Sequence, residues 1–452
     1  MVSHSVKQLA LGFFADRDVV VQRHAGRMTS DAGLLPIRAF DERWGYTRRM
    51  AGCLRDERSG GDHAYVEMLR QRLYGILADY EDCNDHDALR DDPMFKMIAG
   101  RLPDADPLAS QPTLSRFENA VAIPALWTLL DFLTRTGVER LKAHHGGSLP
   151  AKVTLDLDPT DDPTHGHQQL SLFHGYYEQH QYFPMVISEP TTKHVFYTHL
   201  RPGAVHAALG ADDDLMFVVD RLRPARPDVR IHVRGDSGFG IPGMYEICEK
   251  NGLSYTFGIS GNSRLQDAAE PLVRQAAEQY RATGEKQRLF TAFSYRADSW
   301  DRHRTIIAKA ECHSKGINLR FIVTSLPIES VDDPQRLYDD YIQRGESEQR
   351  MDELKNGLHA GRLSCHRFVA NFWRLLLHAA AYNLLNAVRD DPSVPDELRR
   401  ARPETWRSKL IKVAATVVQT TRRIVVRLAG QWPFWDFYTA VTRRALSPSP
   451  GP

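Results

Sequence analysis

Apolar side chains recur at helical spacing through the first third of the chain. In residues 62–80 they follow the period of one helix face, which is the pattern of an amphipathic helix packed on a core. In QPTLSRFENAVAIPALWTLLDFLTR a turn at Pro112 precedes Thr113, which we expect to cap the following helix. Residues 1–150 are therefore predicted to be mainly helical, either with a helix-turn-helix-like DNA reader or with helices that only pack on a core.

The pattern changes near Lys152 to an alternation of apolar and polar residues. VTLDLD, YFPMVIS, VFYTHL, VRIHVRGDS and YTFGIS have this strand texture, and helical segments lie between them. Strands that alternate with helices predict an α/β sheet with helices on its faces. After Asn262 a charged helical piece precedes three more strand candidates, RLFTAFSY, HRTIIAKAEC and LRFIVTSL, and helices return from Pro334.

Composition is that of a globular protein with several modules. The 452 residues are 42% hydrophobic and 25% charged, and a domain typically takes roughly 100–200 residues. No apolar run is long enough to cross a membrane, and the N-terminus does not have the pattern of a secretory signal. The five cysteines form no CxxC pair, which argues against a disulfide framework and a cysteine zinc site. A cytoplasmic protein without membrane partners is expected.

Charge is nearly balanced over the whole chain but not over its last part. The formal net charge is +1, whereas residues 401–452 hold nine basic residues and two acidic ones. A basic stretch of this kind suits contact with phosphates. It is also typical of a solubilising face, so the stretch alone does not identify a nucleic-acid partner.

Two strand candidates end in carboxylates. In VTLDLDPTDD, alternation places Asp156 and Asp158 on one face of the strand, and oxygen ligands of this kind suit Mg²⁺. In IHVRGDSGFG, Asp236 stands at the end of the strand, where functional residues of α/β sheets gather. The carboxylates of Asp158 and Asp236 converge if their strands are parallel neighbours. The alternative for both segments is an ordinary turn built on aspartate.

A third candidate lies in LYDDYIQRGESEQRMDELKNGL. Tyr341, Arg344, Glu348 and Lys355 stand at offsets 0, 3, 7 and 14, which fall within about a 60° arc of one helix face. One stripe of that helix would then carry a carboxylate beside a guanidinium, an ammonium and a phenol. A charged, solvated helix face is the alternative interpretation.

The spacing Tyr-(2)-Arg-(3)-Glu-(6)-Lys of this segment resembles the YREK signature of a large group of bacterial insertion-sequence transposases with a DDE catalytic triad. DLDPTDDPTHGHQQ and RGDSGFG resemble the first- and second-aspartate motifs of the thirteen-eighty-type family in that group. LRDERSGGDHAYVEMLRQRLYGILADYEDCNDHDALRDDPMF and LASQPTLSRFEN resemble its N-terminal blocks. Because the motifs follow one another in the family's order, the resemblance extends from about Thr29 to the basic C-terminal region.

This resemblance implies an α/β fold with a ribonuclease-H-like catalytic core and a β-rich insertion, preceded by a mainly helical N-terminal region. The core's first strand would supply Asp158, its fourth strand Asp236 and a late helix Glu348. The implied regions are a helical DNA-binding and dimerisation region (1–150), the first part of the core (151–261), the insertion (262–330), the last part of the core (331–400) and the basic C-terminal region (401–452).

The resemblance also implies roles for single residues. Asp158, Asp236 and Glu348 would hold two Mg²⁺ ions, with Mn²⁺ as a substitute. Asp158-Pro159-Thr160 matches the Asp-x-Thr usual in the group, and Asp156 stays an alternative or assisting ligand. The residues expected to position DNA phosphates are Tyr341, Arg344 and Lys355. Trp300 is the candidate by position for stacking on a flipped base, and a core or surface tryptophan is the favoured alternative.

The function implied is that of a transposase. It would cleave DNA at the ends of a transposable element and join them to target DNA, with double-stranded DNA bearing terminal inverted repeats as partner and a homodimer in the synaptic complex. The alternatives are a nuclease or resolvase that cuts without joining, and a catalytically silent DNA-binding protein descended from a transposase. A zinc hydrolase built on His165, His167 and His174 is a further, weaker alternative.

Overall fold

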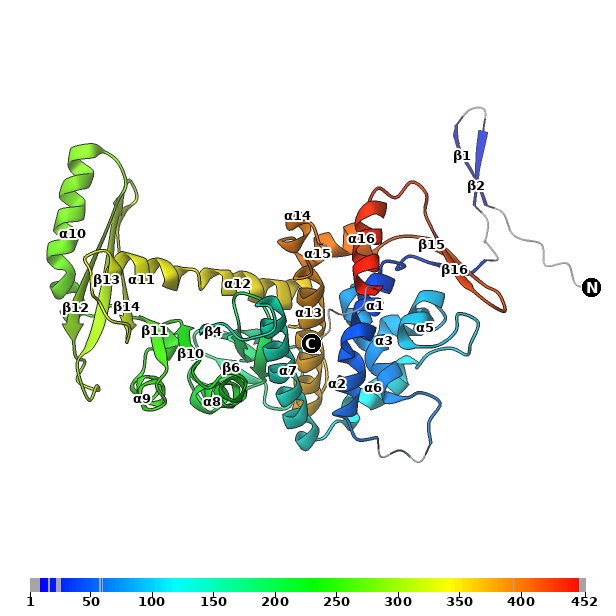
Figure 1. Ribbon diagram of the computed structural model, residues 1–452, viewed down its shortest axis with the longest axis horizontal. Helices are drawn as coiled ribbons and strands as arrows, with labels where there is room; N and C mark the ends of the chain where they lie inside the picture. The colour runs from blue at the N-terminus through cyan, green and yellow to red at the C-terminus, as the bar shows by residue number, and fades with distance from the viewer. Residues whose placement is uncertain are drawn as a thin grey trace, which may run out of the picture.

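The computed structural model describes residues 9–14, 17–21, 26–56, 58, 60–392 and 394–446. It is a mixed α/β structure with one large sheet and many helices, as expected from the alternating strand and helix patterns. Figure 1 shows the N-terminal helices toward one end of the molecule, the central strands of the large sheet in the middle and the outer strands of the same sheet with α10 (Ser263–Thr283) at the other end.

The large sheet has eight strands in the order β12-β13-β14-β11-β10-β4-β8-β9. The strands at its centre carry near-continuous buried residues, which is typical of strands covered on both faces. Their bounds are β4 (Lys152–Pro159), β8 (Met185–Ser188), β9 (Val195–His199), β10 (Arg230–Gly235), β11 (Ser254–Ile259), β12 (Gln287–Tyr295), β13 (Arg304–His313) and β14 (Gly316–Thr324).

The two strands that lead to the predicted aspartates are parallel neighbours. β4 pairs with β10 with Asp156 opposite Arg234, and β11 continues the parallel arrangement beyond β10. β8 and β9 are antiparallel on the other side of β4. The condition for convergence of Asp158 and Asp236 is therefore met, because the carboxyl ends of parallel strands meet at one edge of a sheet.

The three strands expected between residues 288 and 326 are present as β12, β13 and β14. They form an antiparallel meander, and β14 also pairs with β11. The segment thus widens the large sheet instead of forming a sheet of its own. α10 packs on these strands, and its charged outer side accounts for the polar character of its sequence.

The N-terminal region is mainly helical, as predicted, with additions that the apolar periodicity did not indicate. A hairpin of β1 (Leu9–Phe14) and β2 (Arg17–Val21) and the short β3 (Met28–Thr29) precede the helices. Thr113 is not the helix cap: α6 begins at Gln111, and Pro112 lies in its first turn, where a missing N–H costs nothing. The remaining elements are α1 (Leu34–Trp44), α2 (Tyr46–Gly52), α3 (Tyr65–Leu77), η1 (Cys83–Asp85), α4 (His86–Leu89), α5 (Pro93–Ala99), α6 (Gln111–Ala120) and α7 (Ile123–His144).

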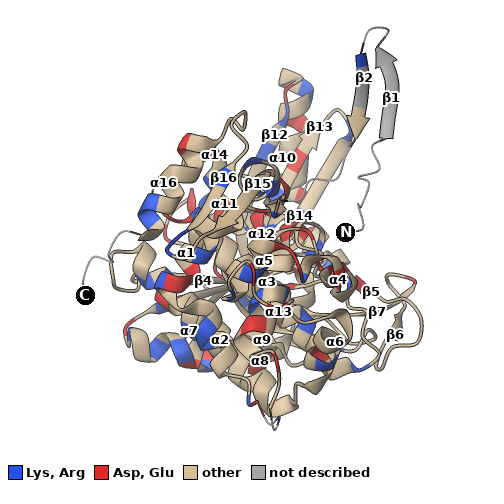
Figure 2. Cartoon of the chain, turned by 90° about the vertical axis from the view of Figure 1, so that its right-hand side faces the viewer, with Lys and Arg blue, Asp and Glu red and all other residues tan. Residues whose placement is uncertain are grey.

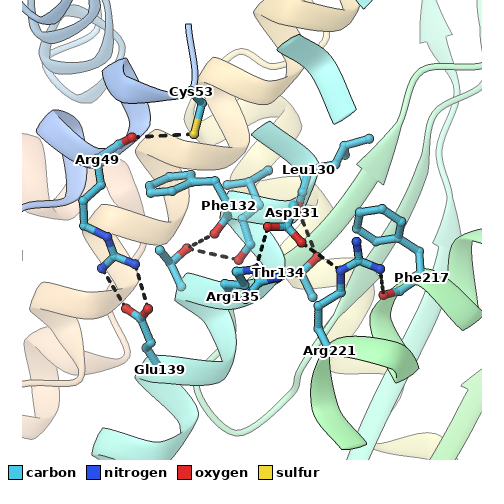
Figure 3. Close-up of polar contacts among 12 residues, drawn as sticks. Arg49, Cys53, Leu130, Asp131, Phe132, Thr134, Arg135, Glu139, Phe217 and Arg221 are labelled. Carbon is cyan, nitrogen blue, oxygen red and sulfur yellow. Dashed lines mark hydrogen bonds and ion pairs between the residues drawn. The ribbon is translucent and has the colours of Figure 1, made fainter. Parts of the chain in front are cut away.

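Charged side chains on two sides of α7 join the N-terminal helices to the sheet region (Figure 3). Arg49 of α2 donates to both carboxylate oxygens of Glu139, at 2.8 and 2.7 Å. On the other side, Arg221 of α8 (Ala211–Leu222) donates to Asp131 at 2.9 Å, and Arg135 donates to the same carboxylate at 2.6 Å. Such partly exposed pairs add little stability each, but the bidentate Arg49–Glu139 pair and the Arg221–Asp131 contact connect α7 to the regions on its two sides.

α13 (Phe368–Arg389) is buried along nearly its whole length. It contacts α3, α6 and α7 on one side and the edge strand β9 on the other. The Asn383 side chain donates to the Val195 carbonyl and accepts from the Val195 N–H, both at 2.8 Å. The Asn383 amide thus provides hydrogen-bond partners for the backbone N–H and carbonyl of Val195, because an edge strand has no neighbouring strand to provide them.

The basic C-terminal region folds onto the N-terminal helices. β15 pairs with β3, Arg407 is buried and donates to the Leu77 carbonyl at 3.1 Å, and Lys412 Nζ lies 2.7 Å from Asp31 Oδ1. Part of the basic excess therefore stabilises the fold, and Figure 2 shows Lys and Arg interspersed with Asp and Glu over this end. The elements are α14 (Asp396–Arg399), α15 (Pro403–Trp406), the π-helical η5 (Arg407–Ile411), β15 (Ala415–Gln419), β16 (Ile424–Leu428) and α16 (Trp435–Leu446).

Candidate active site

One cavity of about 360 Å³ brings together the three carboxylates predicted from the sequence. Asp158 comes from the end of β4, Asp236 from the end of β10, and Glu348 from α12 (Gly345–Asp352). Arg344 and Lys355 line the same cavity. We call this space the catalytic cavity. It gathers side chains from positions far apart in the chain at the carboxyl ends of parallel strands.

Asp158 is a buried carboxylate with one unused oxygen. Its side chain is 9% exposed, and Oδ1 accepts a hydrogen bond from Arg344 Nη1 at 2.7 Å. Burial raises the pKa of Asp158 to about 7, although the Arg344 guanidinium and the Ser347 hydroxyl favour its ionised form. Oδ2 and the Ser347 hydroxyl nevertheless both lack a hydrogen-bond partner of normal geometry among the described residues. Oδ2 is therefore a buried acceptor with spare capacity.

Asp156, two residues earlier on the same strand, is fully paired. It has no exposed surface. Arg234 donates two hydrogen bonds to it, from Nε to Oδ1 at 2.7 Å and from Nη2 to Oδ2 at 3.0 Å. Arg350 Nη2 donates to Oδ2 as well, while Arg350 Nε donates to Ser188 Oγ at 3.3 Å. We call these side chains the Asp156 clamp. It neutralises Asp156 and ties β4, β10 and α12 together, because buried carboxylates need such pairing.

Asp236 is half-buried and caps the short η3 (Ser237–Phe239). Its Oδ1 accepts from the Gly238 N–H at 2.8 Å. The backbone there packs tightly on β11: a Cβ at Gly258 would lie 2.9 Å from Ser237 N and 2.9 Å from Tyr341 Oη. Glycine at position 258 thus allows both Asp236 and Tyr341 to approach the sheet, which is a reason for the glycine in YTFGIS that its strand pattern did not reveal.

Glu348 projects from α12 with a side chain that is 76% exposed. Its Oε1 lies 4.0 Å from Arg344 Nη2, so the Arg344 guanidinium lies between Glu348 and Asp158. The three carboxylates line one cavity, but their oxygens do not all lie within 4.8 Å of one another. Among the described residues, the one group of His, Cys, Asp or Glu side chains with ligand atoms that close together lies elsewhere in the protein. Because the Glu348 side chain is exposed and its contact with Arg344 is long, it has room to turn toward the two aspartates.

A family model for the transposase DDE domain group 1 matches residues 12–448, nearly the whole chain. The chain belongs to the DDE transposases. No curated protein matches it. Among solved structures this transposase is similar to the piggyBac transposase synaptic complex with hairpin DNA, at 10% identity and a TM-score of 0.41, over 94% of this chain and 83% of that chain.

The helix that carries the glutamate of this transposase is interrupted, whereas the sequence pattern predicted one regular face. α11 (Asp333–Ile342) and α12 follow one another as a rod across the sheet (Figure 1), with Arg344 at the junction before Gly345. A π-helical segment, η4 (Glu353–Gly357), continues α12 and shifts the face by its extra residue per turn. Arg344, Glu348 and Lys355 nevertheless line one cavity, as expected from their shared face.

The two other residues of the YREK pattern are held by the protein itself. Tyr341 is not among the residues that line the catalytic cavity. Its hydroxyl donates to the Gly235 carbonyl at 3.4 Å, so it packs behind Asp236. Lys355 Nζ lies 2.7 Å from Asp161 Oδ1 at the cavity wall. Arg234, Arg350 and Asp161 were not predicted as partners of the site. Strand alternation in IHVRGDSGFG, which places Arg234 on the face of Asp236, is the one signal in the sequence that could have indicated Arg234.

Trp300 lies inside the protein with 4% of its surface exposed. Its ring packs edge-on against Tyr245 at 5.2 Å and Tyr295 at 5.6 Å between centroids, and the Arg304 guanidinium lies over it at 5.5 Å. This is the core tryptophan favoured as the alternative. Stacking on a flipped base would require the ring to leave that packing, so the structure does not support Trp300 as a base-stacking residue.

Outside the catalytic cavity, Asp79, Glu81 and His359 form the one cluster in the described residues with metal-ligand spacing. Arg407 pairs with Asp79 at 2.8 Å and Arg362 with Glu81, so the carboxylates are already neutralised. His165, His167 and His174 do not form such a cluster. None of the helices in the described part of the chain has the length and apolarity needed to cross a lipid bilayer.

Proposed function

We propose that this DDE transposase cleaves DNA at the ends of an insertion sequence of the thirteen-eighty type and joins those ends to target DNA. The observation that carries the proposal is the catalytic cavity, where Asp158, Asp236 and Glu348 meet from two parallel strands and one helix. Acidic residues in this arrangement suit phosphoryl transfer assisted by divalent cations.

The proposed core is ribonuclease-H-like. β8 is antiparallel to both of its neighbours, β9 and β4, and β10 and β11 continue parallel to β4. In chain order this gives the arrangement 3-2-1-4-5, with Asp158 on the first strand and Asp236 after the fourth. β12 to β14 and α10 would then be the β-rich insertion between the second aspartate and the glutamate.

The residues of the catalytic cavity fit a pair of Mg²⁺ ions. Asp158 Oδ2 is buried and has no hydrogen-bond partner of normal geometry within the described part of the chain, and a cation would supply one. Asp236 has an oxygen beyond the one that caps Gly238, and Glu348 is exposed to the cavity. Asp158, Asp236 and Glu348 would therefore hold the ions, whereas Asp156 is occupied by two arginines. When bound, such a pair of ions activates an oxygen nucleophile and stabilises the leaving oxygen at phosphorus.

The chain's own cations would position the DNA. Arg344 and Lys355 line the catalytic cavity and are held by Asp158 and Asp161. Both can exchange these carboxylates for phosphate oxygens, because guanidinium and ammonium groups bind either acceptor. Tyr341 would support the site by holding the backbone before Asp236. Such contacts orient a duplex without reading its sequence. Two element ends must be cut together, so a homodimer is the proposed synaptic form.

The test uses purified protein and duplexes taken from the DNA that flanks the coding region. We expect nicking at the element ends with Mg²⁺ or Mn²⁺, none in the presence of a chelator, and covalently joined products when target DNA is added. Glu348→Gln should abolish both products and keep DNA affinity. Glu278→Gln, an exposed glutamate on α10, is the matched control and should cleave normally.

Two results would contradict the proposal. Cleavage by Glu348→Gln at the normal rate would remove this carboxylate from the chemistry. Nicked ends without joined products, under conditions where both ends are present, would indicate a nuclease or resolvase instead of a transposase.

A further inference from the structure

A second cavity, of about 600 Å³, lies on the opposite face of α12 from the catalytic cavity. Its walls come from α12, the turn between β8 and β9, the end of α13 and the end of α14. We call it the arginine pocket, because four arginines line it together with Lys193. They are Arg350, Arg389, Arg399 and Arg400.

Two of these guanidinium groups are buried and only partly paired. Arg350 is 2% exposed and Arg389 is 3% exposed. Arg350 uses Nε and Nη2 in the Asp156 clamp, and its Nη1 has no hydrogen-bond partner among the described residues. Arg389 Nη1 donates to Glu353 at 2.7 Å, while its Nε and Nη2 are without partners. Buried charged donors left in this state are costly unless an acceptor arrives.

The acids in the pocket do not supply that acceptor. Glu353 is already bound to Arg389. Asp390 is held by Arg140 at 3.3 Å and by His144 at 2.6 Å. Glu346 is exposed at the rim. The lining of the arginine pocket thus carries four guanidinium groups and one ammonium group against three carboxylates, and this excess of positive charge favours an anion with several acceptor oxygens.

The rim adds two further arginines. Arg399 is 40% exposed and its Nη1 lies 3.6 Å from Asp396 Oδ1, while its Nη2 donates to the Val394 carbonyl at 3.0 Å. Arg400 is exposed. Planar guanidinium groups bind phosphate and carboxylate oxygens through two parallel N–H donors. Phosphate is the anion that the proposed DNA substrate carries, and the two buried and two rim arginines line a space of about 600 Å³, which has room for one phosphate group.

We propose that the arginine pocket binds a backbone phosphate of the DNA on which this transposase acts, at a second contact point behind the catalytic helix. This inference rests on the proposed function for the identity of the ligand. Arg350 would connect the two sites, since it lines the arginine pocket and its Nη2 holds Asp156 on the strand of Asp158. A phosphate there would fix α12, and with it Glu348, against β4.

The experiment compares the full chain with two variants, without divalent metal. Arg389→Lys keeps a positive charge for Glu353 but removes the forked donors. The double variant Arg399→Gln/Arg400→Gln changes only the rim and serves if Arg389→Lys does not fold. Arg281→Gln, an exposed arginine on α10, is the matched control.

The first arm titrates inorganic phosphate by calorimetry against chloride at constant ionic strength. We expect each pocket variant to bind phosphate about tenfold more weakly than the parent chain, because a charge-assisted hydrogen bond is lost, and the control to bind it normally. Equal phosphate affinity in all four proteins would overturn the proposal. This arm involves no cleavage, so it reads the pocket even if the proposed catalysis fails.

The second arm identifies the source of the phosphate. Duplex affinity is measured over a range of salt concentrations. The rim variant Arg399→Gln/Arg400→Gln removes positive charge and should lower the slope of log affinity against log salt by about 1, whereas Arg389→Lys keeps its charge and should weaken duplex binding with little change of slope. Weaker phosphate binding by both variants with unchanged duplex affinity and slope would overturn DNA as the ligand and indicate a free phosphate compound.

Discussion

The two faces of α12 present opposite deficits. On the side of the catalytic cavity, a buried carboxylate oxygen of Asp158 lacks a donor among the residues that the structure describes. On the side of the arginine pocket, buried guanidinium nitrogens of Arg350 and Arg389 lack acceptors among those same residues. Asp156 lies between them and has neither deficit, since two arginines saturate it. The difference separates residues that are paired for stability from residues that remain available to a ligand, a cation on one face and an anion on the other.

The largest expected effect is on the rate of DNA cleavage and comes from removing the Asp158 carboxylate from the catalytic cavity. Asp158→Asn keeps the volume of the side chain but removes the charge that would hold a cation. We expect cleavage of element ends to fall by at least about a thousandfold, as for the loss of a group that stabilises a transition state by ~4 kcal/mol. The free energy of unfolding should stay the same or rise, because a buried carboxylate disappears. A drop in stability that parallels the drop in rate would mean that Asp158 is structural.

Asp156→Asn should show the reverse. The change leaves Arg234 and Arg350 buried without their counter-charge, so the free energy of unfolding should fall by about 3–5 kcal/mol. Urea denaturation measures this, with the exposed Asp267→Asn of α10 as the control. If Asp156→Asn unfolds like the parent chain but no longer cleaves DNA, Asp156 and not Asp158 is the first metal ligand.

A smaller effect should appear as a pH dependence at Asp162, which lies beside the catalytic cavity. Its side chain lines a space of about 20 Å³, and neither of its carboxylate oxygens has a hydrogen-bond partner in the described residues. Burial raises the pKa of Asp162 to about 8 from an ordinary value of 3.8, against the opposing influence of Lys355. The folded protein thus keeps the proton that the unfolded chain releases.

The sign of this effect follows from proton linkage. Because the folded-state pKa is the higher one, the stability that Asp162 contributes is full below about pH 4 and is lost as the pH rises toward 8, by up to about 1.4 kcal/mol per pH unit. Asp162→Asn removes this loss. Urea denaturation at pH 5.5, 6.5 and 7.5 should show the variant gaining on the parent chain at each step, and parallel stability profiles would show that Asp162 is ionised in the folded protein.

Much of this contrast could be predicted from the sequence, but not all of it. Strand alternation and the spacing of Glu348 indicated the triad, because strands and helices have fixed periods. The pattern could not separate Asp156 from Asp158, since both lie on one face and their difference depends on Arg350, nearly two hundred residues away. The three strands after residue 287 were predicted, whereas their pairing with β11 is a long-range contact that no local pattern reports.

The arginine pocket was not predicted for the same reason. Arg350 stands two residues after Glu348, where the sequence indicates only a charged helix, and Arg389 lies in the last turn of α13, where a basic residue is common. Their burial depends on the turn between β8 and β9 and on α14 closing over them. The π-helical η4 was also not predicted, because a regular α-helix with about 3.6 residues per turn was assumed throughout this segment.

The smallest expected effect concerns Lys355, which the protein holds with Asp161 at the wall of the catalytic cavity. If Lys355 exchanges this carboxylate for a phosphate, the two residues should have opposite effects on DNA affinity. Lys355→Gln should weaken duplex binding by up to about tenfold and lower the salt slope by about 1. Asp161→Asn releases the ammonium and should tighten binding a few-fold, since it removes a competing acceptor. Both are read from duplex titrations without metal. Weaker binding by Asp161→Asn would show that Asp161 aligns the Lys355 ammonium instead of competing with phosphate for it. The catalytic cavity would then hold Lys355 in its DNA-binding position before DNA binds.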